Sequence, residues 1–271
     1  MNRFATVLTA LALLLALVGA NVCFTRRAVL PTVGTDSPML SAVLVAMGGS
    51  RGVVSEVLWW RIADLQRQNR YAELVPLTDL LVTLDPASAD TWVYNAWNLT
   101  YNISAAHHDD AEKWRWVKRG IELLERGLRA APQAEPILRQ LGWIFEDKIA
   151  GSADTSAAYY RAHLAALPLP ADANAFAVRL GCVPDWQNPL IRALYWYDRA
   201  QHAQDTLRTL MALFTEGAPE AMVPYLMATV RRAWDDLAVR QQTQVYGFLQ
   251  HLYATHPQLD EVAAFLQEVA L

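Results

Sequence analysis

One spacing of large and small residues constrains the fold of this chain more than any other feature. Leu138 is followed three and four positions later by the pair Leu141-Gly142, and seven positions later by Phe145. Residues at intervals of three and four lie on one face of an α-helix. A small residue on that face allows a second helix to approach closely. The spacing therefore predicts a helix packed tightly against a neighbour.

Two earlier segments carry looser forms of this pattern. In a unit that begins at Ala89, the corresponding places are taken by Trp92, the pair Asn95-Ala96 and Leu99. A first unit begins at Ser55, 34 residues earlier, and lacks the alternation typical of strands. The apolar residues predicted to share one helical face in this unit are Leu58, Ile62 and Leu65.

Together these units resemble tetratricopeptide repeats (TPRs), which are helix-turn-helix units of about 34 residues. The resemblance covers Ser55 to Pro168 and departs from the family pattern at Leu74 and Leu81, where alanine is usual. It implies an all-α fold, a TPR-like α-solenoid of helix-turn-helix pairs. Because repeat chains of this kind mostly bind proteins, we expect an interaction scaffold or adaptor that is not an enzyme and uses no cofactor or metal.

Turn-forming residues set the expected ends of the helices. The pair Asn69-Arg70 separates the helices of the first unit, and the second helix stops before Asp85-Pro86 because proline lacks an amide donor. Residues from Asn102 to Asp110 form an expected loop. This loop is expected to end in an aspartate N-cap for a helix from Ala111 to Ala130. The last helix of the third unit is expected from Ser156 to Leu167.

The repeat pattern ends near residue 170, and residues 171–271 form an expected C-terminal helical region. The best candidate for a linker is Ala171–Asp185. Gly217-Ala218-Pro219 and His256-Pro257 separate the later helices. These helices are predicted at Pro189–Gln204, Asp205–Thr215, Pro219–Leu237, Arg240–Thr255 and Leu259–Ala270.

The N-terminal segment predicts a single transmembrane helix ahead of the repeats. Phe4 to Phe24 is a run of 21 uncharged residues, which as a helix would span about 31 Å, close to one bilayer core. The alternative is a cleaved signal peptide, since Val18 and Ala20 suit a signal peptidase. Residues 1–27 are therefore a membrane anchor or signal peptide, and residues 28–54 a tether and capping segment.

Two signals in the sequence argue for opposite orientations of the repeats across the membrane. A three-residue head usually stays in the cytoplasm and sends the following domain across, whereas Arg26-Arg27 argues for the opposite orientation. We expect a single-pass protein with an extracytoplasmic domain. The net charge of −4 and the isoelectric point near 5.9 argue against nucleic-acid binding.

The resemblance also implies a concave groove that binds a protein or peptide partner. Its lining follows from positions 2, 5, 9, 12 and 13 of each first helix. In this chain those residues are Glu56, Trp59, Ala63, Gln66 and Arg67; Asp90, Val93, Trp97, Thr100 and Tyr101; and Pro136, Arg139, Trp143, Glu146 and Asp147. Tryptophan, tyrosine and arginine most often contribute strongly to interfaces. The expected partner-binding residues are Trp59, Arg67, Trp97, Tyr101, Arg139 and Trp143.

Other interpretations of these residues and of the chain stay open at this point. The tryptophans of the groove could pack between helices instead, and Trp92, Trp114 and Trp116 are better candidates for the core. The cluster from His107 to Asp110 has metal-ligating residue types, but adjacent side chains rarely converge on one ion. An enzyme or cofactor-dependent protein with its site in the C-terminal helices, or a secreted periplasmic assembly factor, remains an alternative.

Overall fold

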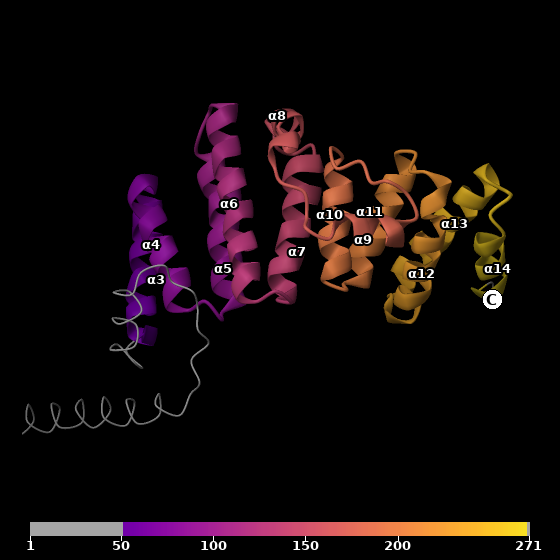
Figure 1. Ribbon diagram of the computed structural model, residues 1–271, viewed down its shortest axis with the longest axis horizontal. Helices are drawn as coiled ribbons and strands as arrows, with labels where there is room; N and C mark the ends of the chain where they lie inside the picture. Colours follow the sequence, from indigo (N-terminus) through magenta and orange to yellow (C-terminus); the bar gives the residue numbers. More distant parts are fainter. Residues whose placement is uncertain (1–50, 270–271) are drawn as a thin grey trace, which may run out of the picture. The chain divides into compact units, whose positions relative to one another are not determined.

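The computed structural model describes residues 51–269, and every regular element in this range is helical (Figure 1). The prediction of an all-α fold is confirmed for this part of the chain, which contains no strand. The predicted membrane segment Phe4–Phe24 and the tether and capping segment up to residue 50 lie outside the described residues. Among residues 51–269, no helix combines the length and apolarity needed to cross a membrane.

The α-helices keep most of the predicted bounds. They are α3 (Arg51–Arg67), α4 (Tyr71–Leu84), α5 (Ala89–Trp97), α6 (Asp110–Ala130), α7 (Glu135–Trp143), α8 (Ala157–Ala162), α9 (Ala173–Leu180), α10 (Pro189–Arg199), α11 (Ala203–Thr215), α12 (Val223–Ala233), α13 (Val239–Thr255) and α14 (Asp260–Val269). Two π-helical segments, η2 (Asn98–Ile103) and η3 (Ile144–Ala150), and three short 3₁₀ turns, η4 (Leu164–Ala166), η5 (Glu220–Met222) and η6 (Trp234–Asp236), complete the described chain.

The chain divides into two compact units, one ending at Asn95 and the other beginning at Ala96. In the first unit, α3 and α4 pack together, and the predicted face of Leu58, Ile62 and Leu65 is buried. The turn between these helices contains Asn69 with a positive φ of 56°, a conformation that asparagine tolerates better than most residues. The predicted turn and the predicted end of α4 at Leu84 are therefore both confirmed.

Helix α5, in which the second unit begins, runs further than its sequence suggests. The expected loop from Asn102 is wrong in its first part, because α5 continues through η2 to Ile103 and packs against α6. Burial of Leu99 and Ile103 against this neighbour explains the extension. The loop that remains ends at Asp109, whose side chain accepts a hydrogen bond from the Glu112 amide at 2.9 Å. An aspartate N-cap is therefore confirmed, but it lies one residue earlier than predicted, because α6 begins at Asp110 and not at Ala111.

The third predicted helix pair consists of α7, its continuation η3, and α8. The expected helix from Ser156 to Leu167 is wrong as a single element, since α8 ends at Ala162 and a 3₁₀ turn follows. A cluster of hydrogen bonds fixes the start of α8. The Ser156 hydroxyl donates to Asp110 at 2.6 Å, and Lys113 donates to Ser156 at 3.0 Å. The start of α8 is therefore tied to the start of α6.

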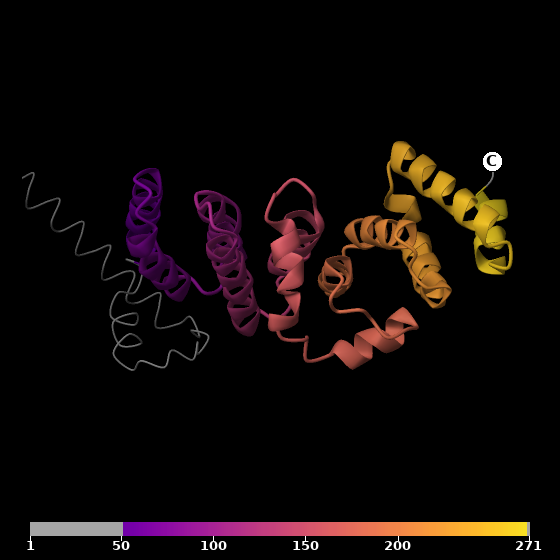
Figure 2. The same cartoon turned by 90° about the horizontal axis from the view of Figure 1, so that it is seen from above.

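The expected linker Ala171–Asp185 contains a packed helix, α9, which Figure 2 shows to one side of α10. Phe176 and Leu180 are fully buried, so this segment belongs to the core of the second unit. The next helix, α10, is buried along its whole length from Pro189 to Tyr197 and contacts α7, η3 and α11. It therefore lies at the centre of the second unit.

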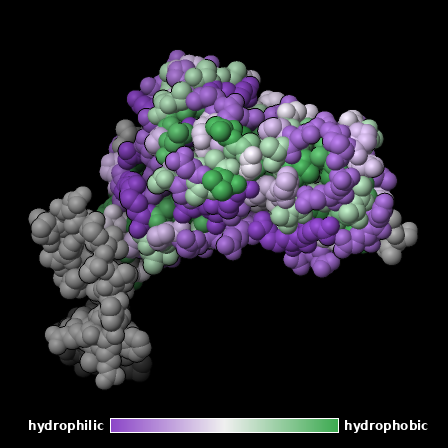
Figure 3. All heavy atoms as spheres, turned by 45° about the vertical axis from the view of Figure 1, so that its right-hand side comes forward, coloured by the Kyte–Doolittle hydropathy of each residue, from purple (hydrophilic) through white to green (hydrophobic). Residues whose placement is uncertain are grey.

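The last helices continue the sequence of neighbour contacts within the second unit. Helix α11 packs on α12, α12 on α14, and α13 on α14. All four lie close to the predicted ranges. Gly217-Ala218-Pro219 separates α11 from α12, and His256-Pro257 separates α13 from α14, and such turns act locally. On the face drawn in Figure 3, apolar residues form small patches among hydrophilic ones.

Candidate functional site

Two of the predicted partner-binding tryptophans occupy matching and exposed places. Trp97 is the last residue of α5 and is 40% exposed, and Trp143 is the last residue of α7 and is 42% exposed. A π-helical segment begins directly after each of them. Short π-helical segments are frequent at functional sites. Because of this exposure, the alternative that these two indoles pack between helices is wrong. The core assignments of Trp92 and Trp114 are confirmed, whereas that of Trp116 is wrong, since its side chain is only half-buried.

Tyr101 connects the two helix ends that carry these indoles. Its ring stacks with Trp97 at a centroid distance of 6.1 Å, and its hydroxyl donates to the Asp147 carboxylate at 3.0 Å. The Lys148 ammonium lies over the same ring at 5.3 Å. Burial and the Asp147 charge raise the pKa of Tyr101 far above its usual value, while the Trp143 indole opposes the shift. Tyr101 therefore remains a neutral hydrogen-bond donor that joins η2 to η3.

Arg139 and Trp143 border a hollow of about 480 Å³, which α7 shares with α10 and α11. Arg139 donates to the Asp205 carboxylate at 3.0 Å from α7. Arg208 reaches the other Asp205 oxygen at 2.6 Å and Glu146 at 2.6 Å. Four charged groups, on α7, η3 and α11, are thus linked in one chain of ion pairs.

A hydrogen bond from Tyr197 and the charges of the two arginines stabilise this network of ion pairs. The Tyr197 hydroxyl, near the C-terminal end of α10, donates to Glu146 at 2.7 Å. Burial raises the pKa of Asp205, but hydrogen bonds and charges from Arg208 and Arg139 outweigh burial, so its pKa lies below the usual range. Asp205 therefore stays ionised near neutral pH, and its bonds to Arg139 and Arg208 hold α7 against α11.

We call Trp97, Tyr101, Arg139 and Trp143 the indole surface, since the contacts of Tyr101 and the hollow beside Trp143 connect them. All four were predicted from the sequence as partner-binding residues. Their supports on α10 and α11 were missed, because the segments that carry them lie more than 50 positions away and show no repeat pattern. Those supports are Tyr197, Asp205 and Arg208.

The remaining predicted residues, Trp59 and Arg67, belong to the unit that ends at Asn95. Trp59 is partly buried and meets the Tyr94 ring edge-on at 4.8 Å. Arg67 is exposed and pairs with Asp64 at 3.3 Å. The most exposed indole of the described chain is Trp60, at 68%, which the repeat alignment does not single out. A partner-binding role for Trp59 and Arg67 stays a prediction.

The chemistry of the indole surface suits binding. Its indoles offer flat apolar area with one hydrogen-bond donor each. The side chains of Arg139 and Arg208 are 43% and 48% exposed, so they can also meet acceptors of a partner. Within residues 51–269, no group of three or more His, Cys, Asp or Glu side chains is arranged to hold a metal ion.

Comparison with known proteins identifies no relative of this chain. No family model, no curated protein and no solved structure matches this chain.

Proposed function

We propose that this chain is a membrane-anchored protein-interaction scaffold or adaptor, built from TPR-like helix pairs, that binds a protein or peptide partner through the indole surface. The observation that carries the proposal is the pair of half-exposed indoles of Trp97 and Trp143 at equivalent helix ends. Exposed aromatic residues on a rigid support are typical of binding hot spots.

The pairing of helices supports the TPR-like part of the proposal. Three pairs, α3 with α4, η2 with α6, and η3 with α8, contact each other in the order expected of such units. Trp97 and Trp143, like Tyr101 and Asp147, are 46 positions apart. This spacing equals the 34-residue unit plus an insertion of about a dozen residues.

Replacing Trp143 with alanine is expected to weaken partner binding by about 2 kcal/mol, because a hot-spot indole loses its contact area. That change corresponds to roughly a 30-fold higher Kd. The partner is first recovered by co-purification from native membranes and identified by mass spectrometry. Its Kd is then measured with the parent chain, Trp143→Ala and Trp97→Ala.

Trp60→Ala is the matched control, since it removes another exposed indole from the chain. We expect it to bind like the parent. Equal affinities of all variants, with cooperative melting retained, would refute the role of the indole surface.

The membrane part of the proposal predicts the fractionation of the protein. The full-length chain is expected to stay in the membrane pellet after alkaline carbonate washing, because an uncharged 21-residue segment partitions into the bilayer. Fractions are followed by immunoblotting. A mature N-terminus at Asn21 would show cleavage instead and favour the secreted assembly factor.

A further inference from the structure

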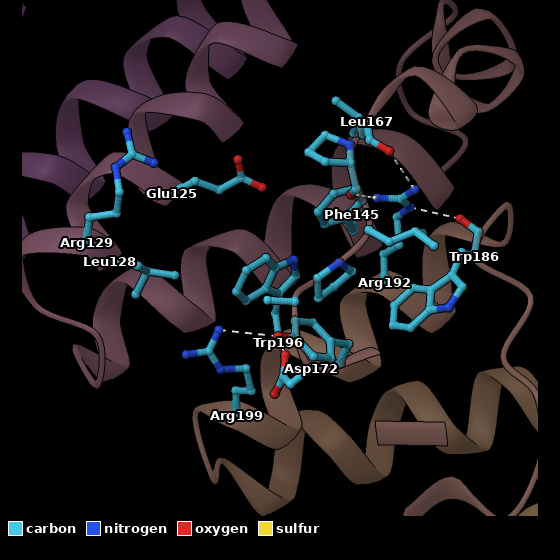
Figure 4. A pocket seen from close by; sticks show the side chains of 15 residues that line it. Glu125, Leu128, Arg129, Phe145, Leu167, Asp172, Trp186, Arg192, Trp196 and Arg199 are labelled. Atoms are coloured by element: carbon cyan, nitrogen blue, oxygen red, sulfur yellow. Dashed lines mark hydrogen bonds between the residues drawn. The ribbon is translucent and has the colours of Figure 1, made fainter. Parts of the chain in front are cut away.

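A second hollow, distinct from the indole surface, lies within the unit that begins at Ala96. It has a volume of about 400 Å³, within the range of small-molecule sites (Figure 4). Its walls come from α6, the start of η3, residues 167–172, Trp186 and α10. None of the four residues of the indole surface lines it.

One wall of this cavity carries a buried guanidinium group without a counter-ion. Arg192 is 4% exposed and donates to the backbone carbonyls of Trp186 at 2.8 Å and Pro168 at 3.3 Å. It also donates to those of Leu164 and Leu167, at 3.2 and 3.4 Å. These bonds engage four of its five N–H groups. In the described range no carboxylate lies within 4.0 Å of it, so its charge is solvated but not neutralised.

The facing wall carries a carboxylate, that of Glu125, which also lacks a counter-ion among the described residues. Figure 4 shows Glu125 pointing from α6 into the cavity towards the side that holds Arg192. Burial and the charge of Glu122 raise the pKa of Glu125, and the charges of Arg129 and Arg192 oppose this shift. Glu125 has neither a hydrogen bond nor an ion pair with the residues in the described part. An unmatched negative charge thus faces an unmatched positive charge.

The surface between these charges is apolar and aromatic. Leu128, Phe145, Leu167 and Trp196 line the cavity, and each is nearly buried. The Phe145 ring also lies 5.8 Å from the Arg192 guanidinium. A ligand that reaches both charges would therefore place an apolar body against these side chains.

Two further arginines give the lining a positive excess. Arg129 and Arg199 also line the cavity, and neither makes an ion pair among residues 51–269. Arg199 instead donates to the Tyr195 hydroxyl at 3.3 Å and lies over the Trp196 ring at 5.5 Å. Asp172, the second carboxylate of the lining, accepts a hydrogen bond from Tyr195. The arginines therefore favour a ligand with an anionic group, and Glu125 favours a cationic group on the same ligand.

We propose that this cavity binds a zwitterionic α-amino acid with an apolar side chain, its ammonium group facing Glu125 and its carboxylate facing Arg192. Such a molecule matches the charge of the buried Arg192 and that of the half-buried Glu125 at once, and fills the apolar surface between them. Charges that are desolvated without a partner are costly, so the free energy of matching them favours this ligand over a singly charged one.

The test uses the full-length chain and L-phenylalanine, with binding followed by calorimetry and by intrinsic tryptophan fluorescence, to which Trp186 and Trp196 contribute. Phenylethylamine lacks the carboxylate, and 3-phenylpropionate lacks the ammonium group. We expect saturable binding of L-phenylalanine and at least tenfold weaker binding of both analogues, because each leaves the charge of either Arg192 or Glu125 unmatched. These measurements need no variant and so do not depend on refolding.

The Glu125→Gln variant then tests the ammonium side separately. It is expected to weaken L-phenylalanine binding at least tenfold and to leave the affinity for 3-phenylpropionate equal or higher. Glu122→Gln is the matched control, because Glu122 lies on the same helix, is 47% exposed and pairs with Lys118. It should bind L-phenylalanine at least as tightly as the parent, because removing the Glu122 charge also favours the ionised form of Glu125.

Three results would overturn the proposal. They are no saturable binding of L-phenylalanine at millimolar concentration, equal or tighter binding of either analogue by the parent chain, and unchanged L-phenylalanine affinity in Glu125→Gln. Loss of partner binding in the tryptophan variants leaves this outcome unaffected, since the two sites share no lining residue.

Discussion

Replacing Gly142 with leucine is expected to lower the free energy of unfolding by about 3 kcal/mol, through overpacking of a buried contact. A Cβ atom at this position would lie 2.5 Å from Cε1 and 2.6 Å from Cδ1 of Tyr197. Tyr197 is 1% exposed and bonded to Glu146, so its ring has no free space in which to move. Chemical denaturation followed by tryptophan fluorescence measures the loss.

The same substitution in an open environment provides the control. Gly247 in α13 has no atom within 4 Å of its would-be Cβ atom. Gly247→Leu should be neutral or stabilising by up to about 1 kcal/mol, because leucine is the better helix former. If Gly142→Leu unfolded at the same denaturant concentration as the parent, the close approach of α7 and α10 would be wrong.

The Gly142 contact also has a consequence for the indole surface. Tyr197 fixes Glu146, and Glu146 in turn holds Arg208 at 2.6 Å. A displaced Tyr197 ring would therefore loosen the ion pairs beside Trp143. We infer that the small residue of the repeat pattern, predicted only as a packing feature, also supports the binding surface.

The sequence predicts those parts of the fold that depend on neighbouring residues. Helix α4 ends before Asp85-Pro86 because proline lacks the backbone N–H that would continue the helix. Helix α6 begins after Asp109 because the carboxylate of Asp109 accepts a hydrogen bond from a backbone N–H of the first turn. The burial of Leu58, Ile62 and Leu65 in α3 follows from their spacing of three and four residues, which places them on one face of the helix. These features are local, so a pattern of a few residues contains enough information to place them.

The parts that could not be predicted depend on packing between distant segments. The segments η2 and η3 extend the first helices because neighbouring helices bury them, and no residue within them marks a π-helix. Arg208 reaches Glu146 across 62 positions of sequence. The exposure of Trp97 and Trp143 agreed with the repeat alignment, whereas the ion pairs that support them became visible only in the structure.

Replacing Lys148 with methionine is expected to cost about 3 kcal/mol of stability, because it removes the counter-ion of the largely buried Asp154 carboxylate and leaves it only the Ser156 amide and the Tyr160 hydroxyl as donors. Lys148 donates to Asp154 at 2.6 Å, and the two side chains are 7% and 15% exposed. The pair joins η3 to the loop before α8, and Lys148 also lies over Tyr101. The substitution should therefore weaken partner binding as well as folding.

Lys118→Met is the matched control, since Lys118 forms an exposed pair with Glu122 at 3.7 Å. Exposed pairs contribute less than about 1 kcal/mol, so this variant should unfold close to the parent. If both lysine variants lost the same free energy of unfolding, the Lys148–Asp154 pair would contribute no more to stability than the exposed Lys118–Glu122 pair.

The stability that the Lys148–Asp154 pair contributes should depend on pH in one direction. Burial raises the pKa of Asp154, but the hydrogen bond and charge of Lys148, with the Ser156 amide, lower it below the unfolded value of 3.8. A carboxyl with a lowered pKa in the folded state contributes stability above its unfolded pKa and loses it as the pH falls through its folded pKa. The difference in unfolding free energy between the parent and Lys148→Met should thus be full near neutral pH and shrink as the pH falls below about 4. Denaturation curves of both chains across this range measure it, and a difference that grows on acidification would contradict the ion pair.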